Sequence, residues 1–312
     1  MSKRILITGS TDGIGKHLAT KLVAEGHEVL LHGRNAAKLE ATVAELSELA
    51  TGPKPTGYRA DLSHVAEVHG LVEQVKSDFD SLDVLINNAG ISTGEERSLT
   101  ENNVELGFMI SVLAPYILTN GLRPLLAASG DARVIYTSSF IHHYAQPYSS
   151  LAAATMDISV MDPDLQTSSA LDAKVEGLEN ELPDFALDEH YNPARSYANA
   201  KLYAIWLTRY QARQFAAEGL PITVNTYHPG LVATKLTGFP TDQEVPASAM
   251  PENMVTIDEG IRTGYRLALS DDFEGVSGEY VDEFTGRPAS DKGYTPKAEA
   301  ALIDYLEAHS RA

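Results

Sequence analysis

The sequence predicts an α/β fold in which a doubly wound parallel sheet carries helices on both faces. Short apolar runs alternate along the chain with stretches whose apolar residues recur every three or four positions, a pattern typical of strands followed by helices. The apolar runs show no internal polar alternation, as expected for parallel strands that are buried on both faces. Open sheets of this kind bind their ligands at the carboxyl ends of the strands.

Each element of the first half has its own signal. Ile and Leu dominate the first run, Gly26 ends the first helical pattern, and a turn rich in Gly and Pro precedes the third strand. The expected strands are Arg4 to Thr8, Glu28 to His32, a short strand that ends near Ala60, and Val84 to Asn87. The expected helices are Ile14 to Ala24, Ala36 to Ala50 and Val65 to Phe79.

The second half continues this alternation with longer helices. The expected helices are Val104 to Leu126, Tyr197 to Glu218, and a terminal amphipathic helix at Ala298 to Glu307. The expected strands are Arg133 to Thr137, Pro221 to Tyr227 and a last short one at Gly278 to Val281.

Two stretches interrupt the alternation, and neither has enough apolar residues for a core of its own. Residues 140–195 mix Ser, Ala, Asp and Pro over a length too great for a simple connection, so we expect an insertion with some helix, for example Leu171 to Leu182. Residues 231–256, rich in Pro, Thr and Met, are expected to form a substrate loop. The sequence therefore predicts a single domain over residues 1–312.

Composition limits the function classes that remain. The chain has 24 Lys and Arg against 43 Asp and Glu, a formal net charge of −19, which disfavours nucleic acid and membrane surfaces as partners. It has no Cys, which excludes disulfides, Cys-ligated zinc, iron–sulfur clusters and a Cys nucleophile. The N-terminus is too short in apolar residues for a signal peptide, and no run reaches transmembrane length, so a cytoplasmic protein is expected.

A glycine-rich loop follows the first strand and opens the first helix. Glycines at this position allow a tight turn, close approach of a pyrophosphate and close helix packing, and the helix N-terminus offers N–H groups to phosphates. A turn that merely needs glycines is the alternative, but the position within a strand–helix series favours a dinucleotide site. The residues of this loop are Gly9, Ser10, Thr11, Asp12, Gly13, Ile14 and Gly15.

The end of the second strand bears on which nicotinamide cofactor fits. No carboxylate stands there to bind an adenosine ribose, and Arg34 can pair with a 2′-phosphate. This favours NADP(H), with NAD(H) as the less favoured cofactor, although Asp12 adds a negative charge nearby. Arg34 as a solvated residue at a helix start is the alternative.

Further candidate cofactor residues follow the third, fourth and sixth strands. Asp61 can accept the adenine amino group, and small residues after the fourth strand let the backbone approach a ribose. These candidates are Asp61, Leu62, Asn88, Ala89, Gly90, Pro229, Gly230, Val232 and Thr234.

Three residues form the candidate catalytic group. Tyr197 and Lys201 stand four residues apart, so they share one helix face, and Ser139 follows the strand that ends at Thr137. A nearby ammonium and a positive nicotinamide both favour the phenolate; lowering the Tyr197 pKa from about 10 to about 7 takes roughly 4 kcal/mol. Such a Tyr can act as acid or base on a carbonyl or alcohol oxygen. Alone, a Tyr-x-x-x-Lys pair carries little weight.

No metal site is expected. His142 and His143 are adjacent in a predicted loop, adjacent residues do not face one another in regular structure, and no acidic or His partner is suitably spaced. We interpret both as polar loop residues.

Taken in order, these motifs resemble the short-chain dehydrogenase/reductase family. The similarity runs from about residue 3 to 285, and the stretches at 138–143 and 228–234 are most similar to the retinol dehydrogenase and carbonyl reductase branches. The matching motifs are Thr8 to Gly15, Asn87 to Gly90, the pair Ser138 and Ser139, Tyr197 to Lys201, and Pro229 to Gly230. The resemblance implies a Rossmann fold, with Ser139 polarising the substrate oxygen, Tyr197 donating the proton, and Lys201 binding the nicotinamide ribose and lowering the Tyr197 pKa.

The chain departs from the family pattern at two places. Ser111 stands where the family usually has an Asn that helps to hold a water on the Lys proton path. Ser139 and Tyr197 are also much farther apart than in most members. The insertion between them resembles in position one that covers the dimer helices in carbonyl reductases, so a monomer is expected alongside a homodimer, and the insertion should wall the substrate pocket.

The sequence therefore predicts an NADPH-dependent oxidoreductase that acts on a ketone, an aldehyde or the corresponding alcohol. Aromatic and apolar residues near the expected pocket, such as Phe140 and Ile141, favour a small, mostly apolar substrate. Two alternatives stay open: a non-catalytic NADP(H)-binding sensor or interaction protein on the same fold, and a reductase of carbon–carbon double bonds.

Overall fold

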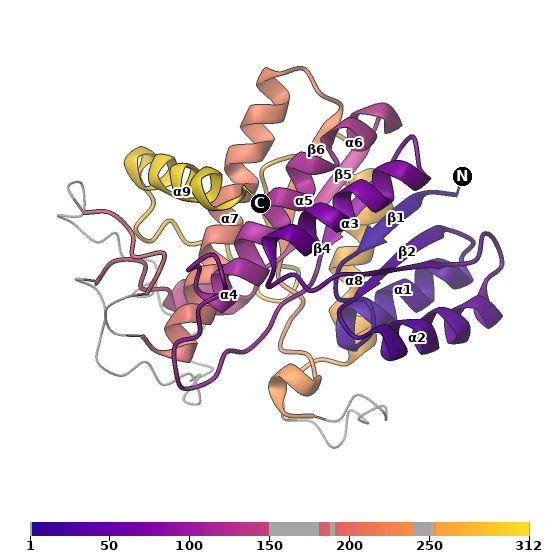
Figure 1. The fold of residues 1–312 in the computed structure, drawn as a ribbon, viewed down its shortest axis with the longest axis horizontal. Helices are drawn as coiled ribbons and strands as arrows, with labels where there is room; N and C mark the ends of the chain where they lie inside the picture. The colour runs from indigo at the N-terminus through magenta and orange to yellow at the C-terminus, as the bar shows by residue number, and fades with distance from the viewer. Residues whose placement is uncertain (1, 150–180, 188–190, 240–250, 252–253, 312) are drawn as a thin grey trace.

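The computed structural model describes residues 2–149, 181–187, 191–239, 251 and 254–311. Seven parallel strands form one sheet in the order β3-β2-β1-β4-β5-β6-β7 (Figure 1). The strands are β1 (Arg4–Ile7), β2 (Glu28–Gly33), β3 (Thr56–Arg59), β4 (Val84–Asn87), β5 (Ala132–Thr137), β6 (Ile222–Tyr227) and β7 (Tyr280–Val281). The strand order reverses between β1 and β4, so the doubly wound fold is confirmed, and a ligand crevice is expected at that reversal.

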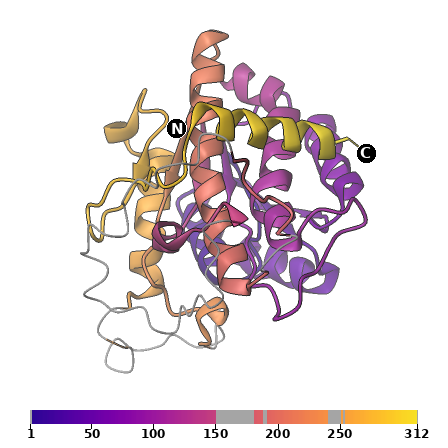
Figure 2. The same ribbon diagram turned by 90° about the vertical axis from the view of Figure 1, so that its left-hand side faces the viewer.

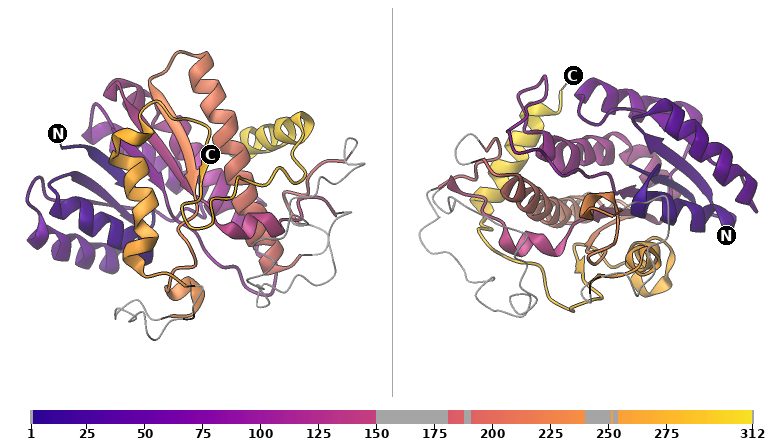
Figure 3. Two further views of the ribbon diagram at one scale, coloured as in Figure 1. Left: turned by 180° about the vertical axis from the view of Figure 1, so that it is seen from behind. Right: turned by 90° about the horizontal axis from the view of Figure 1, so that it is seen from below.

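Helices cover both faces of the sheet and bury a separate apolar layer on each side. The first face carries α1 (Gly13–Ala24), α2 (Ala36–Leu49) and α8 (Ile257–Leu269). Figure 3 looks onto this face in its left panel, with α8 in front of the strands. The opposite face carries α3 (Val65–Asp78), α5 (Ala114–Gly121) and α7 (Pro193–Ala217).

The single long helix expected at Val104 to Leu126 is wrong, because the chain breaks it into several pieces. It comprises α4 (Leu106–Phe108), a π-helical turn η1 (Met109–Leu113), α5, and α6 (Arg123–Ser129), which is bent by 58° from the preceding pieces. Pro115 and Pro124 stand at the starts of α5 and α6. A proline has no N–H to donate to the preceding turn, which explains the bend between α5 and α6.

Helix α7 begins earlier than the expected Tyr197. Asn192 is its N-cap, with the side-chain oxygen accepting hydrogen bonds from the N–H groups of Ala194 at 2.8 Å and Arg195 at 3.2 Å. Pro193 occupies the first helical position, where its missing N–H costs nothing. Tyr197 therefore lies in the second turn of a 25-residue helix, where its backbone is held by both the cap and the following turns.

The C-terminal helix α9 (Pro296–His309) confirms the expected terminal helix and packs across α7 (Figure 2). Tyr305 of α9 makes an edge contact with Phe108 at a ring-centroid distance of 5.3 Å and lies 5.3 Å from Phe185. Phe185 belongs to the described part of the insertion, so α9 and the insertion together cover the outer face of α7. The helix expected at Leu171 to Leu182 falls almost wholly outside the described residues.

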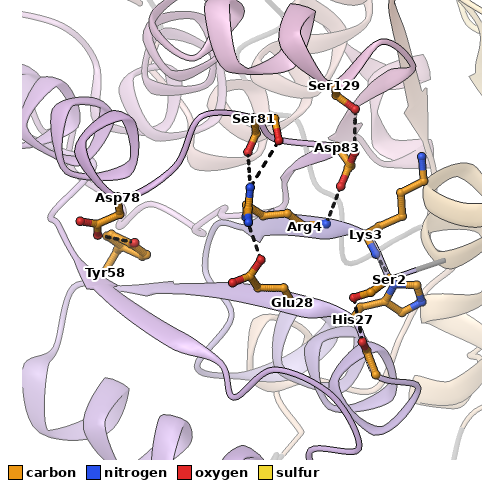
Figure 4. Close-up of polar contacts among 11 residues, drawn as sticks. Ser2, Lys3, Arg4, His27, Glu28, Tyr58, Asp78, Ser81, Asp83 and Ser129 are labelled. Carbon is orange, nitrogen blue, oxygen red and sulfur yellow. Dashed lines mark hydrogen bonds and ion pairs between the residues drawn. The ribbon is translucent and has the colours of Figure 1, made fainter.

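Ion pairs and hydrogen bonds tie the strands together at their amino-terminal ends (Figure 4). The Arg4 guanidinium donates to Glu28 Oε2 at 2.8 Å and to the carbonyl oxygen of Ser81 at 3.0 Å. Asp83 accepts from the Arg4 N–H at 2.7 Å and from Ser129 Oγ at 2.6 Å. The side chains at the amino-terminal ends of the strands make structural contacts. The functional groups are therefore expected at the carboxyl ends of the strands.

Within the described chain, no single helix is long and apolar enough to cross a membrane. Leu106–Gly121 together with Arg123–Ser129 has the length and composition only as a bent pair, and these helices contribute many residues to the core.

Candidate active site

The glycine loop leads from β1 into α1 and lies against the residues that follow β4. Gly9 and Gly13 have φ values of 65° and 49°, which favour glycine. A Cβ at Gly9 would stand 3.0 Å from Ala89 Cα, so the loop needs glycine to approach β4 this closely. Asp12 caps α1 by accepting from the Gly13 N–H at 2.9 Å, and the remaining N–H groups of the first turn point out of the helix end.

Hydrogen bonds join the ends of β1 and β4 at the point where the strand order reverses. Thr8 Oγ1 accepts from the N–H groups of Asn88 and Ala89, each at 3.0 Å. Asn88 Nδ2 donates to the carbonyl oxygen of Thr8 at 2.9 Å. The Asn88 side chain is therefore hydrogen-bonded to the glycine loop. We expect the backbone from Ala89 onward, and not this side chain, to face the crevice.

His32 anchors the glycine loop, a role the sequence analysis missed. Its Nδ1 accepts from the Gly9 N–H at 3.1 Å, and its Nε2 lies 3.1 Å from the carbonyl oxygen of Ala60. These partners assign the ring proton to Nε2. Burial lowers the pKa of His32 to about 4, so the ring is neutral near pH 7 and keeps Nδ1 as an acceptor. A histidine inside an apolar strand was the only sequence signal.

The charge of Asp12 is paired. Asp12 forms an ion pair with Lys38 of α2, which the sequence analysis did not single out. Arg34 is exposed at the end of β2, and its carbonyl oxygen accepts from Arg59 Nε at 3.4 Å. Two cations, Arg34 and Lys38, therefore lie near this end of the glycine loop, and the one carboxylate of the loop already has a cation beside it.

Asp61 lies at the end of β3 with its carboxylate held by Ser63. Its Oδ1 accepts from the Ser63 N–H at 3.0 Å and from Ser63 Oγ at 2.7 Å. Burial acts to raise the pKa of Asp61, but these hydrogen bonds outweigh it and the pKa is lowered, so the group stays ionised. The Leu62 side chain is part of the core, which leaves only its backbone for a ligand.

Ser139, Tyr197 and Lys201 lie together where β5 ends against α7. The Ser139 side chain lies close enough to Tyr197 to act on its pKa. Ser139 Oγ accepts from the Ile141 N–H at 3.3 Å, which fixes the hydroxyl at the start of the 3₁₀ turn η2 (Phe140–Tyr144). Lys201 Nζ donates to the carbonyl oxygen of Thr137 at 2.9 Å and lies 5.4 Å from the centre of the Tyr197 ring.

Burial sets the protonation of this group. It raises the pKa of Tyr197 to about 12, with the Ser139 side chain acting in the opposite direction. Burial also lowers the pKa of Lys201 to about 8. The sequence analysis expected Lys201 to lower the pKa of Tyr197. In the protein without cofactor, burial outweighs this effect and the pKa of Tyr197 is raised.

The two halves of the crevice come together around Gly90 and Gly13. A Cβ on Gly90 would stand 3.4 Å from Lys201 Nζ, so the segment after β4 passes directly over the lysine. A Cβ on Gly13 would stand 3.7 Å from Thr234 Cγ2, which places Thr234 beside the glycine loop. The structure thus brings together the candidates from three strand ends.

The segment after β6 is fixed mainly by backbone conformation and packing. Gly230 has a φ of 83°, and a Cβ there would stand 2.7 Å from Val255 Cγ2. The Pro229 carbonyl oxygen would lie 3.4 Å from a Cβ on Gly260, and Val232 is buried. These residues lie at the carboxyl end of β6, as expected, and shape the chain rather than offering side-chain donors.

Ser111 lies in the π-helical turn η1, buried and packed against α7. A π-turn widens the helix and displaces a backbone carbonyl from its usual partner, and such turns are frequent at functional sites. The helical irregularity that faces the catalytic helix is therefore centred on the position where the chain departs from the family pattern.

Glu105 is a buried carboxylate beside the catalytic helix that the sequence analysis missed. Its Oε2 accepts from the Phe108 N–H at 2.8 Å, and its Oε1 accepts from Ser196 Oγ at 3.0 Å. Glu105 thus caps α4 and ties it to the residue that precedes Tyr197. Nothing in its local sequence signals a partner 91 positions away.

The interpretation of His142 and His143 as polar loop residues is wrong. Both are fully buried, and their rings lie 4.0 Å apart because the 3₁₀ turn η2 folds back on itself. No group of three or more His, Asp or Glu that could hold a metal occurs in the described part of the chain, so a different role has to explain their burial.

The chain is similar to known proteins over most of its length. Residues 3–156 match the family model of short chain dehydrogenases. The chain is 30% identical to retinol dehydrogenase 14 of Mus musculus, over 90% of this chain and 78% of the relative. It is 29% identical to polyprenol dehydrogenase of Homo sapiens, over 88% of this chain and 75% of the relative.

Solved structures share the fold at lower sequence identity. A protein of Mycobacterium paratuberculosis superposes with a TM-score of 0.69 and 22% identity, over 99% of this chain and 93% of the other. A short chain dehydrogenase of Burkholderia cenocepacia, solved with NADP, gives 0.62 and 23%, over 89% and 95%. An NADH-dependent reductase solved with NAD gives 0.60 and 23%, over 90% and 94%.

Proposed function

Because this chain belongs to the short-chain dehydrogenase/reductase family, an oxidoreductase family, we propose that it is an NADPH-dependent enzyme that transfers a hydride between the cofactor and a ketone or aldehyde, or the corresponding alcohol. The observation that carries the proposal is the convergence of Ser139, Tyr197 and Lys201 at the end of β5, beside the crevice at the strand reversal. A protein that only binds the cofactor has no need of all three.

The cofactor would lie across the carboxyl ends of the strands. The glycine loop and the N-terminus of α1 suit the pyrophosphate, since glycine is required there and the first-turn N–H groups are available. Arg34 and Lys38 suit a 2′-phosphate, Asp61 the adenine, and Gly90 with Lys201 the nicotinamide ribose. When bound, the nicotinamide supplies or accepts the hydride.

The chain's own residues would handle the oxygen and its proton. Ser139 Oγ accepts from the Ile141 N–H, which leaves its own hydrogen to donate to the substrate oxygen. Tyr197, which lies beside the same hydroxyl, donates its phenolic proton to that oxygen during reduction and withdraws it during oxidation. Both donors are half-buried side chains, and their interaction with a developing alkoxide is stronger there than in bulk water.

Lys201 would hold the phenolate that forms on Tyr197. Its Nζ is fixed by the carbonyl oxygen of Thr137 on the same side as the Tyr197 ring, so an ammonium there stabilises negative charge on the phenol oxygen. Since the pKa of Lys201 lies at about 8, the ammonium form predominates at neutral pH. Ser111 and the π-turn replace the family's Asn on the path by which this lysine exchanges its proton with solvent.

The substrate is proposed to be a small, mostly apolar carbonyl compound or alcohol. The names of the two relatives, a retinol and a polyprenol dehydrogenase, both refer to apolar alcohols. The net charge of −19 disfavours polyanionic substrates, nucleic acid and anionic membranes, and we propose a cytoplasmic enzyme.

Fluorescence titration with NADPH and NADH, followed by a carbonyl panel that includes retinal, tests the proposal. Tighter binding of NADPH, with turnover of at least one carbonyl, is the expected result. Binding without turnover on this panel would favour a sensor, and reduction confined to conjugated carbon–carbon double bonds would favour the other alternative.

The variant Tyr197→Phe tests the proton donor. It should lower kcat by at least about 10³-fold, as removal of an acid–base group does, while the Kd for NADPH stays within about twofold. Tyr203→Phe is the matched control, because Tyr203 lies on the same helix, is buried, and its hydroxyl has no hydrogen-bond partner in the described chain. Equal losses in both variants would refute the role of Tyr197.

A further inference from the structure

The peptide group that follows Ser139 makes a hydrogen bond to an imidazole ring through its carbonyl oxygen and another through its N–H. The carbonyl oxygen of Ser139 lies 2.7 Å from His142 Nδ1. The N–H of the same peptide unit, which belongs to Phe140, donates to His228 Nδ1 at 3.1 Å. His142, His228 and Phe140 are buried and Ser139 is half-buried, so both contacts lie largely away from solvent.

The partners of the two rings require opposite tautomers. His142 Nε2 accepts from the Ser290 N–H at 3.1 Å, so its proton must be on Nδ1, where it donates to the Ser139 carbonyl. His228 Nδ1 accepts, so its proton must be on Nε2. Burial lowers the pKa of both rings, that of His228 to about 4, so both are neutral at pH 7.

Three distant parts of the chain contact the two histidines and hold them in place. His142 lies in η2, with its ring 4.0 Å from His143 and 4.8 Å from Tyr280 of β7. His228 follows β6, and its N–H donates to the carbonyl oxygen of Val281 at 3.1 Å. Ser290 belongs to the C-terminal segment. The peptide of Ser139 is thus held against the sheet edge and the C-terminal segment together.

We propose that His142 and His228 are positioning residues that fix the Ser139–Phe140 peptide and thereby the direction of the Ser139 hydroxyl. The inference rests on the proposed function, because it assigns a catalytic task to that hydroxyl. Ser139 has extended backbone angles, φ −158° and ψ 152°, and its carbonyl oxygen also accepts from the His142 N–H of the turn at 3.1 Å. A rotation of this peptide would change ψ of Ser139 and displace the Ile141 N–H, which donates to Oγ and holds it at its present position.

The magnitude follows from the geometry of catalysis. A displacement of about 1 Å at a catalytic group costs on the order of 100-fold in rate. Loss of either imidazole contact should therefore lower kcat by about 10- to 100-fold, while the Kd for NADPH, which depends mainly on the glycine loop, changes little.

The tautomers can be measured without any enzyme activity. In ¹⁵N-histidine-labelled protein at pH 7, the nitrogen shifts should show His142 as the Nδ1–H form and His228 as the Nε2–H form, with His142→Gln and His228→Asn used to assign the signals. A protonated ring at either position, or the opposite tautomer, would overturn the inference.

Conservative variants separate positioning from packing. The Asn side-chain amide lies near the position of Nδ1, and the longer Gln amide reaches the position of Nε2. His142→Asn keeps the donor to Ser139 and loses Ser290, whereas His142→Gln keeps Ser290 and loses Ser139. We expect His142→Asn to stay within about threefold of the wild-type kcat and His142→Gln to lose 10- to 100-fold, with similar Tm values.

The same logic applies to the second ring. His228→Asn keeps an acceptor for the Phe140 N–H and should retain kcat, whereas His228→Leu removes it and should not. Equal kcat in His142→Asn and His142→Gln, in an active wild-type background, would refute this inference alone. A wild-type protein that binds NADPH but turns over no carbonyl would instead refute the proposed function, and the catalytic purpose of the two rings with it.

Discussion

Three charged side chains lie near the part of the glycine loop where we expect the 2′-phosphate that distinguishes NADPH from NADH. Asp12 is needed to cap α1, but its carboxylate would repel a 2′-phosphate. The ion pair with Lys38 compensates that charge, and Arg34 stands exposed at the end of β2. The Lys38 ammonium therefore offsets the one negative charge of the glycine loop that disfavours a 2′-phosphate.

Removing Lys38 should weaken NADPH more than NADH. In Lys38→Ala, the Asp12 carboxylate loses the lysine cation and its charge acts more strongly on the 2′-phosphate, so we expect the Kd for NADPH to rise about tenfold, equivalent to about 1.4 kcal/mol, while the Kd for NADH changes little. Nicotinamide fluorescence titration measures both. Lys76→Ala, which removes an exposed lysine paired with Glu73 on α3, is the control. Equal changes for the two cofactors would contradict this assignment.

Lys201 should carry a stability cost at neutral pH. Its pKa is lowered from 10.5 to about 8 by burial, so the unfolded chain binds the proton more tightly than the folded one. Below about pH 8 both states are protonated and the full penalty applies; between about pH 8 and 10.5 only the unfolded state is protonated, so folding stability gains with rising pH.

The variant Lys201→Met should therefore be more stable than the wild type at pH 7, by about 1 to 3 kcal/mol, and inactive. This advantage should shrink as the pH rises from about 8 toward 10.5. Urea unfolding at pH 7 and pH 10 measures it, with Lys76→Met as a surface control. A variant that is less stable at pH 7 would show that the hydrogen bond to Thr137 outweighs the desolvation of the ammonium.

At the scale of elements, strands and their order were predictable and the break in the long helix was not. Strand positions follow from local composition, and all seven agree with the sequence to within a few residues. The stretch from Val104 to Leu126 keeps helical apolar spacing across the π-turn and the bend, so periodicity alone cannot reveal either. The bend depends on Pro124 and on the packing of α5 and α6 against neighbouring elements.

The contact between α4 and α7 gives a prediction at this scale. A Cβ on Gly107 would stand 2.7 Å from Ser196 Oγ and 3.1 Å from Glu105 Oε2, so Gly107→Ala must displace the hydrogen-bonded Ser196 and Glu105 side chains next to Tyr197. We expect a loss of about 1 to 3 kcal/mol in stability and a lower kcat.

Gly70→Ala is the matched control, because it lies inside α3 and a Cβ there meets nothing within 4 Å. It should raise stability by about 0.5 to 1 kcal/mol through the unfolded state and leave kcat unchanged. Thermal unfolding and steady-state kinetics on the two variants measure both effects. Equal behaviour of the two glycines would show that the α4–α7 contact yields without cost.

The candidate site also contains residues that the sequence predicts and residues that it does not. Tyr197, Lys201 and the glycine loop are short-range motifs, so the sequence exposes them. His32, Glu105 and His142 act on partners far along the chain, at Ala60, Ser196 and Ser290. Their burial is set by the tertiary fold, and a single buried His or Glu has no sequence signature that separates it from an exposed one.

At the scale of the whole molecule, the two edges of the sheet have different tasks. The amino-terminal ends of the strands are joined by the Arg4–Glu28 ion pair and by hydrogen bonds to Asp83 (Figure 4), and the carboxyl ends carry the candidate site residues. The last part of the chain then returns over the catalytic side, where Ser290 meets His142 and the Gly293 carbonyl oxygen accepts from Tyr148 at 2.6 Å. The C-terminal segment therefore belongs to the site as much as the glycine loop does.

The covering of α7 gives the final prediction, that the protein is a monomer. A helix face that mediates dimerisation must be apolar and uncovered, but here α9 lies across α7 and Phe185 fills the space between α9 and Phe108 (Figure 2). A net charge of −19 adds repulsion between copies. Light scattering should therefore give one species of 33.7 kDa.

Lifting α9 should change that state. Leu302 and Leu306 are fully buried residues of α9, so the double variant Leu302→Arg with Leu306→Arg should release the helix and expose the aromatic cluster around Tyr203 and Phe185. We expect larger species that grow with protein concentration. Leu49→Arg, at a leucine of α2 that is already 45% exposed, is the control and should remain monomeric. A wild-type protein of twice the monomer mass would place the dimer interface elsewhere, because the α7 face is already buried within the chain.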